Sequence, residues 1–132
     1  VCSPGPKGFG KVLVVDDSRT GRMVARLMLE SVGVLVDEAT DGRQAVEMVR
    51  ETQYNAVFMD CQMPVMDGYE ATQQIRGLSG EHAQVPIIAL TANVQAEDVA
   101  RCFECGMNDY VPKPVNKAQL LEKLTLCDHA IG

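Results

Sequence analysis

The stretch 54–68, YNAVFMDCQMPVMDG, is the part of the sequence that most clearly indicates the fold. Its first part, residues 56–59, is a short apolar run with the length of one buried strand. The run ends in a carboxylate, Asp60, and the pair Asp67-Gly68 then indicates the start of a helix. In open α/β sheets, ligands bind at the carboxyl ends of the strands. Asp60 is therefore the first candidate for chemistry.

The length and composition predict one globular domain without a nucleic-acid interface. A chain of 132 residues has the size of one domain, and the net charge of −6 argues against a basic nucleic-acid footprint. No apolar run reaches the ~18 residues of a membrane span, so we expect no membrane contact by this domain and a cytoplasmic location. We expect residues 1–10, rich in Gly and Pro, to be a linker or a tail at a cut end, and 128–132 to be a C-terminal tail.

The five cysteines fit a reducing compartment better than a disulfide framework, because their number is odd and their spacing is irregular. Cys102 and Cys105 form a C-x-x-C pair, but a zinc site needs a second pair or a nearby His. A redox role needs a helix N-terminus or cationic neighbours, and this pair lies late in an expected helix. We therefore interpret the pair as structural.

Apolar runs and helical periodicity alternate along the chain and predict five strand–helix units. The expected strands are 11–15, 34–39, 56–59, 87–90 and 109–112. Helices are expected at about 19–32, 68–77, 95–105 and 117–127. A further helix, marked by Ala45, Val46 and Val49, follows the turn at 41–42 and reaches about 51. Such alternation implies a parallel sheet covered by helices on both faces. Right-handed crossovers then favour a doubly wound, flavodoxin-like α/β sheet with the strand order 2-1-3-4-5.

Two of these helices show apolar stripes that predict how they pack. The first places Met23, Val24, Leu27, Met28 and Val32 on one helical face. In the fourth, we expect Val99, Cys102 and Phe103 to point inward.

Four strands of this sheet end in polar side chains at one edge. The first is followed by Asp16 and Asp17, the third ends at Asp60, the fourth at Thr91 and the fifth before Lys113. Three crowded carboxylates repel one another unless a cation intervenes, and Mg²⁺ is the usual ion held by carboxylates and water. Lys113 and Thr91 suit an anion with several oxygens, such as a phosphoryl group. The set predicts phosphoryl transfer, in which a carboxylate can itself form an aspartyl phosphate.

These residues resemble a response-regulator receiver domain of two-component signalling over residues 11–127. The resemblance rests on VVDDS (14–18), MDCQMPVMDG (59–68), LTAN (90–93) and YVPKP (110–114), in the right order and spacing. The second motif is most similar to the C-terminal receivers of hybrid sensor histidine kinases. The parent chain is therefore expected to be such a kinase, with or without a membrane anchor, and a stand-alone regulator stays open.

The resemblance implies a role for each site residue. Asp60 would accept a phosphoryl group from a phosphohistidine, and Lys113 would pair with the phosphoryl oxygens. Thr91 would move to hydrogen-bond them, and Tyr110 would swing into the space left behind. These movements would switch the face formed by the fourth helix, fifth strand and fifth helix.

The resemblance also implies ligands and partners. Mg²⁺, or Mn²⁺ in its place, would be bound by Asp16, Asp17, Asp60 and the backbone carbonyl of Gln62, with Asp16 acting largely through water. The backbone N–H groups of Cys61 and Ala92 would contact the phosphoryl group. The partners would be a histidine kinase, a His-containing phosphotransfer domain, or both.

Two other functions compete with the phosphoacceptor. The isolated receiver would catalyse only its own phosphorylation and slow hydrolysis, so it would not be an enzyme for other substrates. A Mg²⁺-dependent phosphatase of the haloacid-dehalogenase type would need a second Asp two residues after Asp60, where this chain has Gln62. A receiver used only as an interaction module, independently of phosphorylation, would not need the complete set of acids and Lys113.

Overall fold

The computed structural model describes residues 11–31, 33–52, 54–61, 66–78, 81–92, 95–113 and 115–123. The strands are β1 (Lys11–Val15), β2 (Leu35–Ala39), β3 (Ala56–Asp60), β4 (Ile87–Thr91) and β5 (Asp109–Pro112). The helices are α1 (Arg19–Glu30), α2 (Gly42–Glu51), α3 (Gly68–Arg76) and α4 (Ala96–Cys105), with a 3₁₀ turn η1 (Glu81–Gln84) and a last helical segment, 117–123. The strands lie in the order β2-β1-β3-β4-β5 with parallel pairing throughout, which confirms the predicted sheet.

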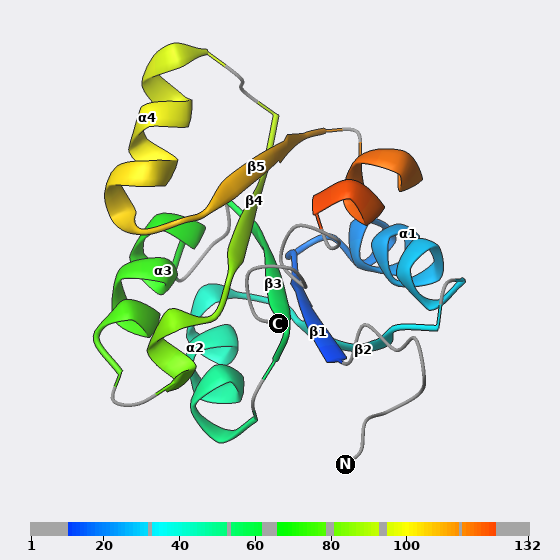
Figure 1. The fold of residues 1–132 in the computed structure, drawn as a ribbon, viewed down its shortest axis with the longest axis horizontal. Coiled ribbons are helices and arrows are strands. Elements are labelled where there is room, and N and C mark those ends of the chain that lie inside the picture. Colours follow the sequence, from blue (N-terminus) through cyan, green and yellow to red (C-terminus); the bar gives the residue numbers. More distant parts are fainter. Residues whose placement is uncertain are drawn as a thin grey trace.

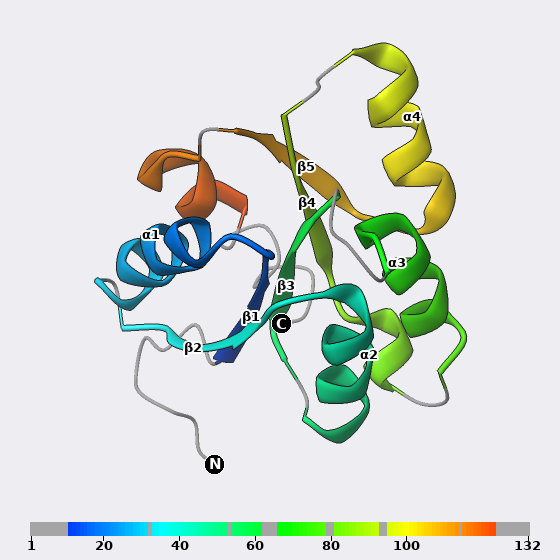
Figure 2. The same ribbon diagram turned by 180° about the vertical axis from the view of Figure 1, so that it is seen from behind.

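Successive residues of the strands enter two separate core layers. Val12 and Val14 of β1 pack in one layer with Leu29 of α1, and all three are fully buried. Leu13 and Val15 enter the other layer, which also contains residues of α2, α3 and α4. Figures 1 and 2 show α1 and the segment 117–123 together on one side of the sheet, and α2, α3 and α4 on the other. The period-2 alternation of a strand thus builds a doubly wound domain.

The central strands are buried along their whole length. Every residue of β3 and β4 is buried, including the polar residues at their ends, Asp60 and Thr91. Continuous apolar runs of this kind are typical of parallel strands covered on both faces. Within the described ranges, no helix combines the length and the apolar character that crossing a membrane requires.

The helices differ in how they begin. Ser18, Asp41 and Asp67 cap α1, α2 and α3, and each side chain accepts a hydrogen bond from a backbone N–H in the first turn of its helix. Gln95, at the same position before α4, makes no side-chain cap hydrogen bond. A cap of this kind contributes about 1 kcal/mol. The start of α4 is therefore less firmly fixed than the starts of the other three helices.

The apolar surface of α1 is wider than its contact with the sheet. Ala25 and Leu29 are buried against the strands, whereas Met23, Val24 and Leu27 are exposed, Leu27 to 56%. The stripe that periodicity indicated is therefore only partly core-facing. Residues beside a buried stripe share its periodicity, so the sequence pattern does not separate them.

In α4, the prediction that Phe103 points inward is wrong, because its side chain is 47% exposed. The buried residues of this helix are Cys102 and Cys105. Cysteines are small, so α4 lies on its neighbours with little side-chain volume between. Gly106 then ends the helix in the left-handed conformation (φ 113°), which glycine adopts readily.

Candidate functional site

Three acidic side chains lie together at the C-terminal edge of the sheet. Asp60 ends β3, and Asp16 and Asp17 follow β1, which is its neighbour. One carboxylate oxygen from each residue lies within 4.8 Å of the other two. Asp16 and Asp60 are only 4% exposed, whereas Asp17 is exposed. The winding of the sheet changes direction between β1 and β3, so the topology itself brings these acids together.

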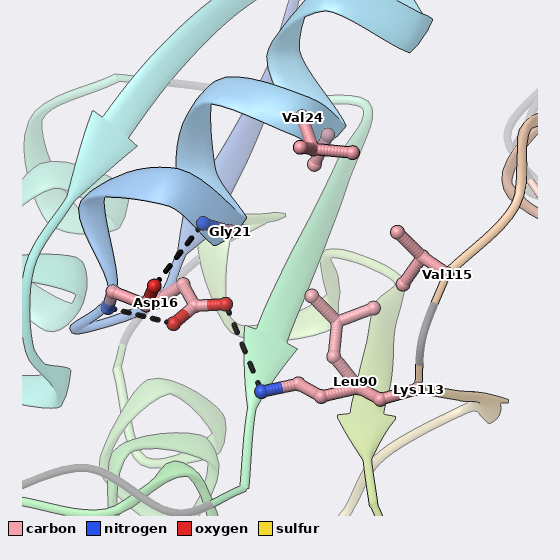
Figure 3. Close-up of a pocket in the computed structure, with 8 residues that line it drawn as sticks. Asp16, Gly21, Val24, Leu90, Lys113 and Val115 are labelled. Atoms are coloured by element: carbon pink, nitrogen blue, oxygen red, sulfur yellow. Dashed lines mark hydrogen bonds and ion pairs between the residues drawn. The ribbon is translucent and has the colours of Figure 1, made fainter.

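Lys113 is the cation of this cluster. Its Nζ lies 3.1 Å from Oδ1 of Asp60 and 3.7 Å from Oδ2 of Asp16, and Figure 3 shows its side chain reaching toward Asp16. The side chain is 32% exposed, so it can also meet a group arriving from solvent. One ammonium group against three carboxylates leaves excess negative charge, which a hard divalent cation would offset. Clustered carboxylate oxygens are ligands that Mg²⁺ accepts, so these residues fit that ion.

Backbone contacts fix the end of β3. The N–H of Cys61 donates to the carbonyl of Leu90 over 3.1 Å, and the N–H of Gly68 donates to the carbonyl of Cys61 over 3.2 Å. A Cβ atom on Gly68 would overlap the carbonyl oxygen of Asp60. Glycine is therefore required for α3 to begin this close to the acidic strand end.

A cavity of about 190 Å³ opens at this edge and brings together most of the predicted site residues. The predicted residues that line it are Asp16, Asp17, Asp60, Cys61, Thr91, Ala92 and Lys113. Thr91 is buried at the end of β4, and Ala92, the next residue, is exposed. Tyr110 does not line the cavity: it is half-buried on β5 and packs against the core layer under α2, α3 and α4. Gln62 lies outside the described residues.

Comparison with known proteins decides the family. The family model for the response regulator receiver domain matches residues 12–125, which is most of the chain. This chain belongs to the response regulator receiver domain family. The family is the one that the sequence motifs indicated, and the prediction of a phosphoacceptor signalling domain of two-component type is confirmed with it.

Relatives of this receiver domain include hybrid and sensor kinases. The hybrid signal transduction histidine kinase L of Dictyostelium discoideum is 40% identical over 121 residues, which cover 88% of this chain and 7% of the kinase. The sensor protein GacS of Pseudomonas syringae is 38% identical over 114 residues, which cover 85% of this chain and 13% of the sensor. The chain thus spans only a small part of the length of both relatives.

Solved structures of other receiver domains share the fold. One, from a sensor histidine kinase of Pseudomonas aeruginosa, has a magnesium ion coordinated in its active site cleft; it is 41% identical, with a TM-score of 0.84 over 90% of this chain and 97% of that chain. Another match lies in a complex of the histidine phosphotransfer protein Ypd1 with the receiver domain of Ssk1 from Saccharomyces cerevisiae. It is 33% identical, with a TM-score of 0.81 over 87% of this chain and 86% of that chain.

Several residues of this receiver domain line the cavity although the sequence did not assign them to the site. They are Ser18, Tyr69, Leu90 and Asp98. Tyr69 and Asp98 belong to the first turns of α3 and α4, and the guanidinium group of Arg101 lies over the Tyr69 ring, 4.0 Å from its centre. Burial, together with the neighbouring Cys61, raises the pKa of Tyr69. First-turn residues of helices that start at this edge face the strand ends, and that signal could have identified both.

Cys61 of the cavity wall belongs to a group of buried thiols. The Sγ atoms of Cys61 and Cys102 are 3.9 Å apart, and the Cys105 thiol donates to the carbonyl of Cys102 over 3.1 Å. All three cysteines are free and buried. Burial, and next the adjacent Cys102, raise the pKa of the Cys61 thiol to about 12. A thiol that stays protonated at neutral pH is a poor nucleophile, so the Cys61 thiol acts as a core side chain.

A second cavity, of about 440 Å³, adjoins the acidic edge of this receiver domain (Figure 3). Val24 of α1, Leu90 of β4 and Val115 give it apolar walls. The residues that line both cavities are Asp16, Ser18, Leu90 and Lys113, so the two cavities adjoin there. The polar site therefore continues sideways into an apolar surface beside α1.

Proposed function

We propose that this receiver domain accepts a phosphoryl group on Asp60 from a phosphohistidine, with Mg²⁺ bound at the acidic edge. The cluster of Asp16, Asp17 and Asp60, with the Lys113 ammonium 3.1 Å from Asp60, carries this proposal. A carboxylate oxygen of Asp60 attacks phosphorus, the P–N bond breaks, and the imidazole leaves with the bonding electron pair. A buried carboxylate with fixed backbone contacts suits this step, because phosphoryl transfer depends mostly on positioning and charge neutralisation.

The acidic edge would hold the metal ion. Its proposed ligands are the carboxylates of Asp16, Asp17 and Asp60, with Asp16 acting largely through water, and the backbone carbonyl of Gln62, which lies outside the described residues. When bound, the ion offsets the negative charge of the carboxylates and of the phosphoryl oxygens. We expect Mn²⁺ to substitute for Mg²⁺. The magnesium ion in the related domain from P. aeruginosa supports this assignment.

Four other residues that line the cavity would bind the phosphoryl oxygens. Lys113 offers an ammonium group, Thr91 a hydroxyl group, and Cys61 and Ala92 their backbone N–H groups. The backbone N–H of Lys113 donates to the carbonyl of Thr91 over 2.8 Å, so these two residues form one unit at the ends of β4 and β5. A group bound by both would therefore act on two adjacent strands at once.

Thr91 and Tyr110 would couple phosphorylation of Asp60 to a change at another face of the domain. We infer that the Thr91 hydroxyl moves toward the phosphoryl group and that the Tyr110 ring fills the space it leaves. Tyr110 lies on β5, which pairs with β4, and its side chain packs against the core layer that includes Cys102 and Cys105 of α4. The face made of α4, β5 and the segment 117–123 would therefore be the output, as a two-state equilibrium biased by phosphorylation.

The phosphoryl donor would be a histidine kinase or a His-containing phosphotransfer domain that docks beside α1. Met23, Val24 and Leu27 are exposed there, and the 440 Å³ cavity continues their apolar surface up to Lys113. An exposed apolar patch next to a polar reaction cavity suits a protein donor, because the patch can bind while the phosphohistidine enters the cavity. The complex formed by a related receiver domain with Ypd1 supports this class of partner.

We infer that residues 11–127 form the receiver domain of a longer, hybrid histidine kinase, in a cytoplasmic part of that protein. The family match over 12–125 and the hybrid kinases among the relatives support this placement. The isolated domain would hydrolyse its own phosphoryl group slowly and act on no other substrate. No feature of the described residues favours the phosphatase or the phosphorylation-independent module.

Intact-mass measurement after incubation with acetyl phosphate tests this function. We expect one phosphoryl adduct that needs Mg²⁺, is stable in acid and is lost in base. Asp60→Asn should abolish the adduct. Asp67→Asn, which alters a nearby acid that caps α3 and does not line the cavity, should keep it. An adduct that forms equally in EDTA, or one that persists in Asp60→Asn, would contradict the proposal, and so would no adduct at all.

A further inference from the structure

Arg22 on α1 contacts the main chain of Asp16 at the acidic edge of the sheet. Its Nη1 donates to the backbone carbonyl oxygen of Asp16 over 2.8 Å, and its side chain is only 14% exposed. We propose that Arg22 is a positioning residue for the Mg²⁺ site: it holds the peptide between Asp16 and Asp17 so that both carboxylates face Asp60. This inference rests on the proposed Mg²⁺-dependent function of that site.

Arg22 holds the carbonyl group of Asp16, which the other contacts of this residue do not fix. The N–H of Asp16 donates to the carbonyl of Ala39 over 3.1 Å. Its Oδ1 accepts from the N–H of Ser18 over 2.8 Å, and its Oδ2 faces Lys113. These contacts fix the amide and the carboxylate of Asp16. The carbonyl marks the plane of the next peptide, and a turn of that plane would carry the exposed Asp17 carboxylate away from Asp60.

Glu38 on β2 holds Arg22 in turn. The Nε of Arg22 lies 3.1 Å from Oε1 of Glu38, and the other carboxylate oxygen, Oε2, accepts from Nη1 of Arg26 over 2.6 Å. A guanidinium group is planar, so its bond to Glu38 fixes the direction in which it can reach Asp16. The chain Glu38–Arg22–Asp16 therefore connects the neighbouring strand to the metal ligands.

The charge of Arg22 and its hydrogen bond act on Mg²⁺ binding in opposite directions. A cation close to the carboxylates repels the metal ion, so if Arg22 acted only through its charge, removing it would tighten Mg²⁺ binding. If Arg22 positions the ligands, its removal weakens binding. Residues that orient metal ligands typically contribute about 10- to 100-fold to metal affinity. The sign of the change therefore distinguishes positioning from charge.

Arg26 provides a matched control. It lies one turn further along α1, carries the same charge and shares the Glu38 carboxylate with Arg22. Its guanidinium group pairs with Glu30 and Glu38, whereas the carbonyl of Asp16 accepts its hydrogen bond from Arg22. Arg26→Gln thus removes a similar charge and disturbs the same carboxylate while it leaves the contact between Arg22 and Asp16 in place.

Calorimetric titration of Mg²⁺ into the unphosphorylated chain tests the inference without relying on activity. We expect Arg22→Gln to weaken Mg²⁺ binding about tenfold, and Arg26→Gln to leave it unchanged or slightly tighter. Arg22→Lys keeps the charge but cannot bridge Glu38 and Asp16 in the same way, so it should also weaken binding, even if Arg22→Gln fails to fold. Urea unfolding in EDTA establishes which variants are folded.

Three outcomes would overturn the inference. Folded Arg22 variants that bind Mg²⁺ as tightly as the original chain, or more tightly, would show that the arginine does not position the ligands. Equal weakening by Arg26→Gln would assign the effect to the shared Glu38 network instead. If the original chain itself bound no Mg²⁺, the proposed function would fail together with the inference. If the original chain bound Mg²⁺ and the Arg22 variants bound it with the same affinity, only the inference would fail.

Discussion

The helices α1 and α4 flank the same edge of the sheet from opposite faces, and they are attached to it by different kinds of contact (Figures 1 and 2). Ser18 caps α1, and Arg22 ties this helix both to Glu38 of β2 and to the main chain of Asp16. These are hydrogen bonds, most of them involving charged groups, which are the stronger kind. The helix beside the proposed metal ligands is therefore held firmly in one position.

The contacts that hold α4 are less polar than those that hold α1. Gln95 gives it no side-chain cap, its buried Cys102 meets Cys61 at 3.9 Å, and Arg101 lies over the ring of Tyr69. Elements held by few polar contacts are those that shift or open most easily. The difference fits the proposed function, in which α1 would offer a fixed surface to the phosphoryl donor and α4 would respond when the site is filled.

The largest expected effect is on the rate of phosphotransfer, when an exposed apolar residue of α1 is replaced by an acid. We expect Leu27→Asp on α1 to slow phosphotransfer from a phosphorylated His-containing phosphotransfer protein about 30-fold, because a central apolar contact in an interface is worth about 2 kcal/mol. Phe103→Asp on α4 is the matched change and should leave this rate unaltered. Loss of radiolabel from the donor measures the rate.

Acetyl phosphate separates docking from chemistry in the same variants. It needs no protein surface, so Leu27→Asp and Phe103→Asp should both be phosphorylated by it at the original rate. A comparable slowing with both donors would mean that the Leu27 change damages the site. Equal slowing of both variants with the protein donor would remove the contrast between the helices.

The next effect concerns how α4 senses the site. We expect Tyr110→Ala to be phosphorylated normally, because Tyr110 does not line the reaction cavity. The change in the amide spectrum of α4 on phosphorylation should nevertheless lose most of its amplitude, since the side chain that would transmit it is gone. A full α4 response in this variant would exclude Tyr110 from the switch.

Substitutions at the N-caps of α1 and α4 should change the free energy of unfolding in opposite directions. Ser18→Ala removes the bond to the N–H of Gly21 and should lower the free energy of unfolding by about 1 kcal/mol. Gln95→Ser adds a capping residue to α4 and should raise it by roughly 0.5–1 kcal/mol. Urea unfolding measures both. If Gln95→Ser brought no gain, the start of α4 would already be satisfied in another way.

The smallest effect is on the alkaline stability of the thiols under α4. An unfolded Cys61 ionises near its ordinary pKa of 9.0, but the pKa in the folded state is raised to about 12. Between these values the unfolded chain loses a proton that the native chain keeps, so the free energy of unfolding falls as pH rises. We expect Cys61→Ala to flatten this fall by less than about 1 kcal/mol per pH unit, measured by urea unfolding.

Tyr54 contributes to the same decline, because burial, with its hydrogen bond to Asp37, raises its pKa as well. The informative quantity is therefore the difference in slope between the original chain and Cys61→Ala. An identical slope in both would show that the Cys61 thiol ionises equally readily in the folded and unfolded states.

The sheet and its acidic edge could be predicted because they depend on rules that ignore side-chain detail. Alternating strands and helices with right-handed crossovers bring the ends of β1 and β3 together, so Asp16 and Asp60 had to meet. Lys113 follows from the same rule, since β5 ends at that edge.

The sequence could not reveal contacts that depend on the angle at which a helix lies on the sheet. Periodicity grouped Leu27 with the packing stripe of α1 and turned Phe103 of α4 inward, yet both are exposed. The bond from Arg22 to the carbonyl of Asp16 joins a side chain to a main-chain atom, which leaves no pattern of paired residue types. Its partner Glu38 lies on another element, beyond the reach of local spacing.

Hydrogen–deuterium exchange with and without beryllofluoride and Mg²⁺ tests most directly the claim that a phosphoryl group on Asp60 is sensed by α4 while α1 stays fixed. We predict altered exchange in peptides from α4 and β5, unaltered exchange across α1 beyond its first turn, and no change in Asp60→Asn. Equal changes in α1 and α4, or none in either helix when the fluoride complex is bound, would contradict it.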